Sequence, residues 1–364
     1  MPISVIRPVI EPGRRIIVIG DINGNDEAFT KLLAKAEYSK KDILIILGNL
    51  VEEGPDSLRT LRHVMELSQN GDVYCLLGSS DVIVRELLRN DRNEELLQHI
   101  LKNENCIIAD MLKTCGIPLK KDSNMFLVKQ SLRVLYEREI AFVCAMPHIL
   151  ETEHFMFAHA QVYPGNPEDM KPSEVIRGDA FLNKGFSFRK YVVVGHWPVM
   201  LYGGKLRKAN PIVNSTRKII CLNGGISVQR DGQLNALIIP DESSEEFSFI
   251  CEDMLPKGRV LNSQMAGETA NTLTWPNNVV IPLERTGDFV YCKQDKTDLN
   301  FWVPESFLKC RDGVWYSEDV TDYQIPVSYG EIVSVILKTS RGYLVKKNGV
   351  AGWYYGMLEP LGKE

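Results

Sequence analysis

The sequence predicts an α/β domain followed by a small all-β region. Short apolar runs that end at a glycine alternate with segments whose apolar residues recur at helical spacing. The runs are IIVIG (16–20), ILIILG (43–48) and VYCLLG (73–78). Their Ile, Val and Leu content indicates strands buried on both faces. From residue 273 onward, aromatic and β-branched residues stand in short alternating runs between turn residues, which is typical of antiparallel strands.

Helices are expected between the first strands. The segment 27–38 places Phe29, Leu32 and Leu33 on one helical face, and 57–68 repeats this pattern with Leu58, Leu61 and Val64. Mostly helical segments continue from Asp81 to about Tyr136. Strand-like runs return at 141–144, 154–158, 191–195, 218–222 and 234–239. We therefore expect a first domain over 1–240, a linker over 241–272 and an all-β region over 273–364.

Self-similarity within the all-β region suggests two related small barrels. The run 279–293 resembles 333–347, and 301–308 resembles 352–361. The order of loops and strands from Asp322 onward is similar to an SH3-type barrel. Its aromatic residues have two interpretations, a groove for extended or proline-rich peptides or simply barrel core. These residues are Trp302, Trp315, Trp353, Tyr354 and Tyr355.

Composition excludes several classes of function. The chain has 364 residues, 24% of them charged, and a formal net charge of −5 without any Lys/Arg block, which argues against nucleic-acid or anionic-membrane binding. The eight cysteines form no C-x-x-C pair, so we expect free thiols in a reducing compartment. No signal-peptide core or membrane-spanning run is evident, so we expect a cytoplasmic protein.

Polar residues gather in five loops, and each loop follows a strand-like run. Because strand ends share one edge of an α/β sheet, these loops are expected to line one crevice. The loops are GDINGN (20–25), GNLVEEGPDS (48–57), GSSD (78–81), FAHAQVYPG (157–165) and VVVGHWP (192–198).

The order and spacing of these loops resemble the calcineurin-like metallophosphoesterases. The similarity is closer to the bacterial serine/threonine and diadenosine-polyphosphate phosphatases, whose loops read GDIHGN, GDLVDRGPDS, GNHD, a short HAG-like loop and GHTP. It extends over about residues 14 to 240. The resemblance implies a sandwich of mixed β-sheets flanked by helices, and a two-metal site for phosphate esters.

Only part of that metal site is retained. The resemblance implies that Asp21, His159 and His196 are metal ligands, whereas Asn23 replaces a ligand histidine and Asn49 the bridging aspartate. Neutral amides hold divalent cations poorly. Ser79 stands where the family has a ligand asparagine, and Ser80 where it has the histidine that protonates the leaving group, a contribution of about 10²- to 10⁴-fold.

Two acidic residues bear on the substrate and on a rescue of the site. Glu53 replaces an arginine that clamps phosphate, so its carboxylate is expected to repel a phosphate dianion. Glu52 replaces an aspartate and is one methylene longer, so it is a candidate substitute for Asn49. The resemblance then leaves room for a single weakly bound Mn, Zn or Fe ion, or for no metal.

Structural interpretations compete with each of these. His159 and His196 could be buried histidines satisfied by backbone groups, and Asn23, Asn49, Ser79 and Ser80 could cap helices.

Two functions follow. The first is an impaired phosphatase that acts as a binding or regulatory protein, with a protein or peptide partner at the SH3-like region or a nucleotide-like ligand. The alternative is an active metal-dependent serine/threonine-type phosphatase or phosphoesterase, with Asp21, Glu52, His159 and His196 around one metal.

Overall fold

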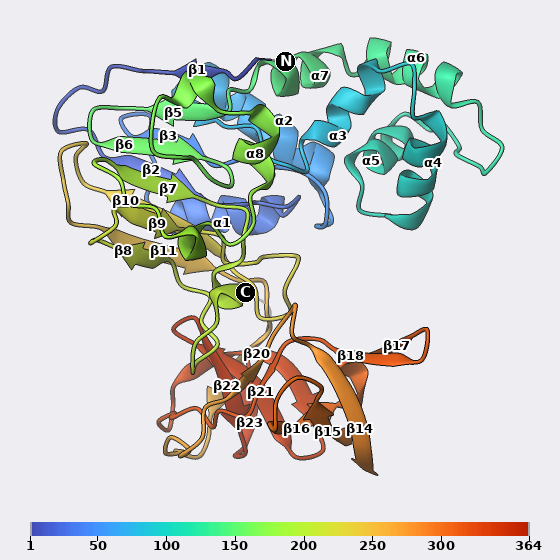
Figure 1. Cartoon of the computed structure of the whole chain (residues 1–364), viewed down its shortest axis with the longest axis vertical. Helices are drawn as coiled ribbons and strands as arrows, with labels where there is room; N and C mark the ends of the chain where they lie inside the picture. Colours follow the sequence, from blue (N-terminus) through green and yellow to red (C-terminus); the bar gives the residue numbers. More distant parts are fainter. Residues whose placement is uncertain (1, 363–364) are drawn as a thin grey trace. The chain divides into compact units, whose positions relative to one another are not determined.

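The protein forms two compact units in the computed structural model, which describes residues 2–362 (Figure 1). The first unit extends to Val199 and resumes from Pro211 to Glu252. The second contains Met200–Asn210 and the chain from Asp253 onward. The segment 241–272, expected as a linker, differs from that expectation: residues 248–252 pair with a strand of the first unit, and residues 257–260 pair with a strand of the second.

Two mixed β-sheets form the first unit. One has the order β1 (Val5–Ile6), β5 (Ile149–Glu151), β6 (Phe155–Ala158), β7 (Tyr191–Val194), β9 (Ile219–Cys221) and β8 (Ile212–Asn214). The other has the order β11 (Ser248–Glu252), β10 (Leu234–Ile239), β2 (Ile16–Ile19), β3 (Ile43–Ile46) and β4 (Asp72–Cys75). Strands β2, β3 and β4 are parallel neighbours, as are β6, β7 and β9. The loops after these strands therefore leave the two sheets at their carboxyl edges.

The core of the first unit has two layers, which follow from the alternation of side chains along β2. Ile16 and Val18 pack between the sheets, with Phe157 and Val193 of the other sheet. Ile17 and Ile19 belong to the layer that the helices cover. All four β2 residues are fully buried, which explains why the run is continuously apolar and not alternating.

Eight α-helices accompany the sheets in the described part of the first unit. They are α1 (Asp26–Lys35), α2 (Ser57–Asn70), α3 (Val82–Arg85), α4 (Asn93–Lys102), α5 (Ile107–Thr114), α6 (Met125–Leu135), α7 (Glu137–Ala145) and α8 (Pro172–Arg177). Helices α4, α5 and α6 lie together at one end of the unit (Figure 1). Helix α5 contacts α2, and α4 contacts α6, so this helical group is anchored beside the loop that follows β3.

A buried histidine holds the first strand. His148 lies just before β5, its Nδ1 accepts a hydrogen bond from the Ser4 backbone N–H at 3.1 Å, and the His148 backbone N–H donates to the Ser4 carbonyl oxygen. Burial, with a smaller contribution from the Arg85 charge, lowers the pKa of His148 to about 4. The neutral imidazole is thus the form that fits beside β1.

Acidification should release β1. The unfolded chain protonates His148 near pH 6.5 and the folded chain only near pH 4, so this contribution to stability is present above 6.5 and is lost as the pH falls toward 4. A proton on Nδ1 also removes the acceptor of the Ser4 N–H. We expect hydrogen exchange of residues 4–6, corrected for intrinsic rates, to be faster at pH 5 than at pH 7. His148→Asn, which retains a side-chain acceptor but does not titrate, should abolish this pH dependence; an unchanged dependence would contradict the assignment.

The second unit contains two five-stranded antiparallel sheets. One has the order β16 (Asn300–Pro304), β15 (Phe289–Gln294), β14 (Val279–Thr286), β18 (Val314–Ser317) and β17 (Leu308–Arg311). The other has the order β22 (Val350–Tyr354), β21 (Gly342–Lys347), β20 (Ile332–Thr339), β12 (Lys257–Val260) and β23 (Leu358–Pro360). A two-stranded sheet joins β13 (Thr272–Leu273) to β19 (Val320–Thr321). The all-β character of this region agrees with its alternating sequence pattern.

Each of the two sheets contains a hairpin, β14–β15 in one and β20–β21 in the other. The two hairpins pair in the same register, which supports an internal repeat. Ile281 pairs with Lys293, and Ser334 pairs with Lys346, so both partners are displaced by 53 positions. Each hairpin also has a register shift, at Pro282/Glu284 and at Val335/Leu337. The displacement is one residue shorter than a match of 279–293 with 333–347. An SH3-like fold for this unit stays a prediction.

The aromatic residues of the second unit have both predicted environments. Trp353 and Tyr354 are buried in its cores, whereas Trp302 and Tyr355 are exposed. All eight cysteines are free. Between residues 2 and 362, no helix combines the length and the apolar character needed to cross a bilayer.

Candidate active site

The loops after β2, β3, β4, β6 and β7 bring the predicted site residues together at the carboxyl edges of the two sheets. Asp21 follows β2 and is 2% exposed. Its carboxylate accepts hydrogen bonds from the Asn49 side-chain amide and from the His196 backbone N–H, both at 2.9 Å. Burial raises the pKa of Asp21 to about 7, against the opposing effect of these two donors. Gly195 is required here, because a Cβ on it would lie 2.4 Å from Asp21 Oδ1.

Asn49 uses both ends of its side chain inside this network. Its Nδ2 donates to Asp21, and its Oδ1 accepts from the Ser80 backbone N–H at 2.9 Å and from the Ser79 hydroxyl at 3.3 Å. The Asn49 backbone has a φ of 50°, in the left-handed region that asparagine tolerates better than most residues. Gly78 packs against this turn, where a Cβ would lie 2.1 Å from the Asn49 backbone nitrogen. The amide is therefore held in one orientation.

Two neutral imidazoles face the Ser79 hydroxyl. His159 Nδ1 lies 2.8 Å from the Leu47 carbonyl oxygen, so this nitrogen carries the proton and Nε2 is left as an acceptor. His196 Nε2 lies 3.4 Å from an oxygen of Asp179, which leaves Nδ1 free to accept. Ser79 Oγ is 3.4 Å from each remaining nitrogen, and its single proton serves one acceptor at a time, either of these nitrogens or Asn49 Oδ1. Burial lowers the pKa of both histidines, so both rings are uncharged at neutral pH.

These residues do not fit a two-metal centre. The Asn49 amide presents N–H groups to Asp21 where two cations need a shared oxygen ligand. Asn23 also donates its amide, to the Ile226 carbonyl oxygen at 3.0 Å. Among the described residues, no group of three His, Cys, Asp or Glu ligand atoms within 4.8 Å includes Asp21, His159 or His196. The imidazole pair alone supplies two of the four ligands that zinc usually takes.

Ser80, Glu53 and Glu52 line a cavity of ≈ 400 Å³ beside this network. Ser80 Oγ is buried and has no hydrogen-bond partner in the part of the chain that the structure describes. Besides Glu52, the charged residues that line the cavity are Glu53, Glu86, Glu95, Arg92 and Arg177. These lining residues therefore include more carboxylates than guanidinium groups, and the His99 imidazole among them lies 3.0 Å from a Glu52 oxygen.

Glu52 differs from the expected substitute for Asn49. Its carboxylate accepts from the Ile107 backbone N–H at 2.9 Å and lies 3.0 Å from His99 Nε2. The reason is the backbone: Glu52 has a φ of 74° and Glu53 a φ of 63°. This left-handed turn places the Glu52 side chain beside helices α4 and α5.

The structure also differs from the alternative prediction that four polar residues of the loops cap helices. These residues are Asn23, Asn49, Ser79 and Ser80. The N-cap of α1 is Asn25, whose side chain accepts from the Ala28 N–H, and the N-caps of α2 and α3 are Asp56 and Asp81. The loops are longer than a simple strand-to-helix turn. The side chains of Asn23, Asn49 and Ser79 therefore bond across the site and not to the next helix, and the Ser80 hydroxyl has no partner among the described residues.

Sequence reasoning assigned no role to Asp81, His99 or Cys106. Asp81 is fully buried and accepts three backbone N–H groups from the neighbouring loops. Its place at the end of the GSSD loop was the only available signal. His99 and Cys106 lie in helical segments without a motif, so nothing in the pattern indicated that they meet Glu52.

Comparison with known proteins identifies a family for this arrangement. Residues 14–200 match the calcineurin-like phosphoesterase family model. A symmetrical bis(5'-nucleosyl)-tetraphosphatase of Nitrosospira multiformis is 26% identical over 256 residues, which cover 65% of this chain and 80% of that protein. A protein of the same name from Buchnera aphidicola is 29% identical over 134 residues, covering 35% of this chain. The chain spans 48% of that relative, about half its length.

Solved structures give matches of lower similarity. A putative diadenosine tetraphosphatase has 18% identity and a TM-score of 0.44, covering 69% of this chain and 99% of that one. A metallophosphoesterase from Sphaerobacter thermophilus has 15% identity and a TM-score of 0.38, covering 66% and 89%. The family model matches more than half of the 364 residues and includes all five loops. The chain therefore belongs to the calcineurin-like phosphoesterase family.

Proposed function

We propose that this calcineurin-like phosphoesterase has lost two-metal hydrolysis of phosphate esters and acts by binding. The orientation of Asn49 carries the proposal. Its amide nitrogen donates to Asp21 and its oxygen accepts from Ser79 and Ser80. The Asn49 amide and the His196 backbone N–H, both uncharged, thus donate to the Asp21 carboxylate that the family's metals would otherwise neutralise. The site can therefore fold without a cation.

The cavity beside the network supports the same proposal. A phosphate dianion there would meet Glu52, Glu53, Glu86 and Glu95, against the two guanidinium groups of Arg92 and Arg177. Such an excess of carboxylates opposes a phosphate group and favours a neutral or cationic ligand. Ser80, which replaces a leaving-group acid, cannot supply a proton at neutral pH as an imidazolium does.

The purified protein should hydrolyse phosphate esters no faster than its own His159→Ala variant. Assays would use p-nitrophenyl phosphate and a dinucleoside tetraphosphate, the substrate class in the relatives' names, with Mn²⁺ or Ni²⁺ in excess. A catalytic acid alone contributes about 10²- to 10⁴-fold, so its loss together with that of the metal bridge should leave no turnover above this control.

His63→Ala is the matched control for loss of an imidazole. His63 Nδ1 lies 2.7 Å from an oxygen of Asp26, and His63 is not one of the residues of the candidate site. Metal-dependent turnover that persists in His63→Ala and disappears in His159→Ala would contradict the proposal. It would instead support the alternative of an active phosphoesterase with a rearranged site.

We propose that a protein or peptide partner binds to the second unit. Trp302 is exposed, lies 5.0 Å from the Tyr291 ring, and has the Arg341 guanidinium 4.1 Å above its own ring. Exposed aromatic groups of this kind bind extended or proline-rich peptides on small β-barrels. We propose the cytoplasm as the location, because eight free thiols suit a reducing compartment.

A further inference from the structure

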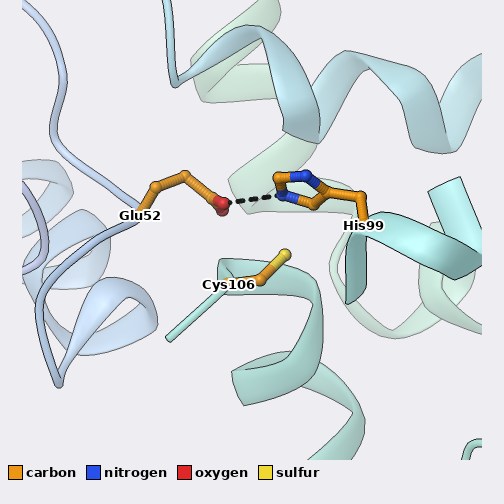
Figure 2. A group of neighbouring side chains, drawn as sticks. All are labelled: Glu52, His99 and Cys106. Carbon is orange, nitrogen blue, oxygen red and sulfur yellow. Dashed lines mark hydrogen bonds and ion pairs between the residues drawn. The ribbon is translucent and has the colours of Figure 1, made fainter. Parts of the chain in front are cut away.

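Three potential metal ligands converge beside the loop that follows β3. A Glu52 carboxylate oxygen, a His99 ring nitrogen and the Cys106 sulfur all lie within 4.8 Å of one another. Figure 2 shows the three side chains pointing toward a common centre from the loop, from α4 and from the start of α5. They come from segments up to 54 positions apart, so only the fold brings them together.

The backbone fixes the position of each ligand. Glu52 is in a left-handed conformation, with a φ of 74°, and one carboxylate oxygen accepts from the Ile107 N–H at 2.9 Å. Its other oxygen is directed to His99 Nε2 at 3.0 Å. Cys106 is the N-cap residue of α5 and is fully buried. A strained non-glycine turn that aims a buried carboxylate at an imidazole and a thiol is typical of a functional site.

The chemistry of these ligands selects among metal ions. A thiolate, an imidazole and a carboxylate together suit zinc, whereas magnesium and calcium prefer oxygen ligands alone. In a tetrahedral zinc site, ligand atoms lie about 2.0–2.3 Å from the ion. Their mutual separations would then be near 3–4 Å, so small side-chain rotations suffice to close the present arrangement.

The thiol needs a cation to become a ligand. Burial, followed by the nearby Glu52 carboxylate, raises the pKa of the Cys106 thiol to about 12, although the N–H groups of Ile108 and Ala109 act in the opposite direction. Without a metal, the thiol is therefore protonated at neutral pH. Zinc would displace that proton, as it does at other thiol ligands.

We propose that Glu52, His99 and Cys106 form a zinc site that is separate from the family's own metal position. Glu52 and His99 also line the ≈ 400 Å³ cavity, so the fourth coordination position is open to a water or to a ligand in that cavity. This site goes beyond the proposed function, because it requires neither Asp21 nor the histidine pair and does not depend on whether phosphate esters are hydrolysed.

Metal titration of the full chain tests this site. Protein freed of metal by chelation is titrated with Zn²⁺ against a chromophoric chelator, and with Co²⁺ to detect a thiolate-to-cobalt absorption band. We expect one Zn²⁺ per chain, release of a proton and a thiolate band. Cys106→Ser places a residue that favours N-caps at the start of α5 and His99→Ala removes a partly exposed ring, so both should fold. Each should weaken binding by more than the about 10- to 100-fold that a changed outer-shell partner costs.

Two further variants separate this site from other sources of zinc. His159→Ala tests the family position, and Cys310→Ser tests an exposed thiol outside the cluster; neither should change the affinity or the band. Thermal unfolding of every variant verifies folding. The proposal is overturned if the wild type binds no Zn²⁺ above the chelator control. It is also overturned if Cys106→Ser retains the affinity, or if His159→Ala alone abolishes it.

Discussion

At pH 8, above the pKa of about 7 of Asp21, Asn49→Asp should destabilise the metal-free protein by about 3–5 kcal/mol, the usual cost of an uncompensated buried charge. The side-chain amide now donates to Asp21 Oδ2 at 2.9 Å, and both residues are buried. The substitution removes that donor and places a second carboxylate against the first. Mn²⁺ or Zn²⁺ should restore much of the loss, because a cation between two carboxylates converts repulsion into binding. Denaturant unfolding with and without metal measures both effects.

The charge-swapped double variant Asp21→Asn/Asn49→Asp is the matched control. It contains the same two side chains in exchanged positions, so the site again holds one carboxylate and one amide. Asparagine at position 21 can still accept from the His196 N–H, as Asp21 does at 2.9 Å. We expect the swap to recover most of the lost stability and to show little metal dependence. If it is as unstable as Asn49→Asp alone, like-charge repulsion is not the cause.

The fold of the first unit was predictable because its signals are local. The continuously apolar run of β2 indicates a strand covered on both faces, and the structure confirms this, with Ile16 and Ile17 fully buried in different layers. The boundary between the units was harder to predict from the sequence. Residues 248–252 and 257–260 form edge and inner strands of different sheets, and such short, polar strands carry a weak period-two pattern.

The site was predictable as a set of loops but not as a set of contacts. Loop order placed Asp21, His159 and His196 at one edge, since strand ends of an α/β sheet converge there. The direction of the Glu52 side chain depends instead on a left-handed backbone at a non-glycine residue, which has no sequence signature. The contact of Glu52 with Cys106 depends further on how α5 packs. Tertiary packing of this kind produces no recognisable spacing of residues in the sequence.

Removal of the Asp81 carboxylate should have the other large effect on stability. Its Oδ2 accepts from the Gly78 and Asn49 N–H groups and its Oδ1 from the Leu50 N–H, all at 2.8 Å. It thereby joins the loops that follow β3 and β4, at a position with no solvent exposure. Asp81→Ala leaves three buried donors, each costing about 1–3 kcal/mol, so we expect a loss of at least about 3 kcal/mol in urea unfolding.

The measurement belongs at pH 8, because burial raises the pKa of Asp81 to about 6 and the carboxylate is then charged. Asp110→Ala is the matched control, since this half-buried carboxylate accepts from the Leu58 N–H at the start of α2. Water can replace it, so its loss should cost less than about 1.5 kcal/mol. The loss of stability for Asp81→Asn should lie between those for Asp81→Ala and Asp110→Ala. One oxygen of the asparagine still accepts, while its new amide faces a backbone N–H. Equal losses of stability for Asp81→Ala and Asp110→Ala would mean that water reaches the junction of the two loops. The Asp81 carboxylate would then not be what fixes the loop that carries Asn49.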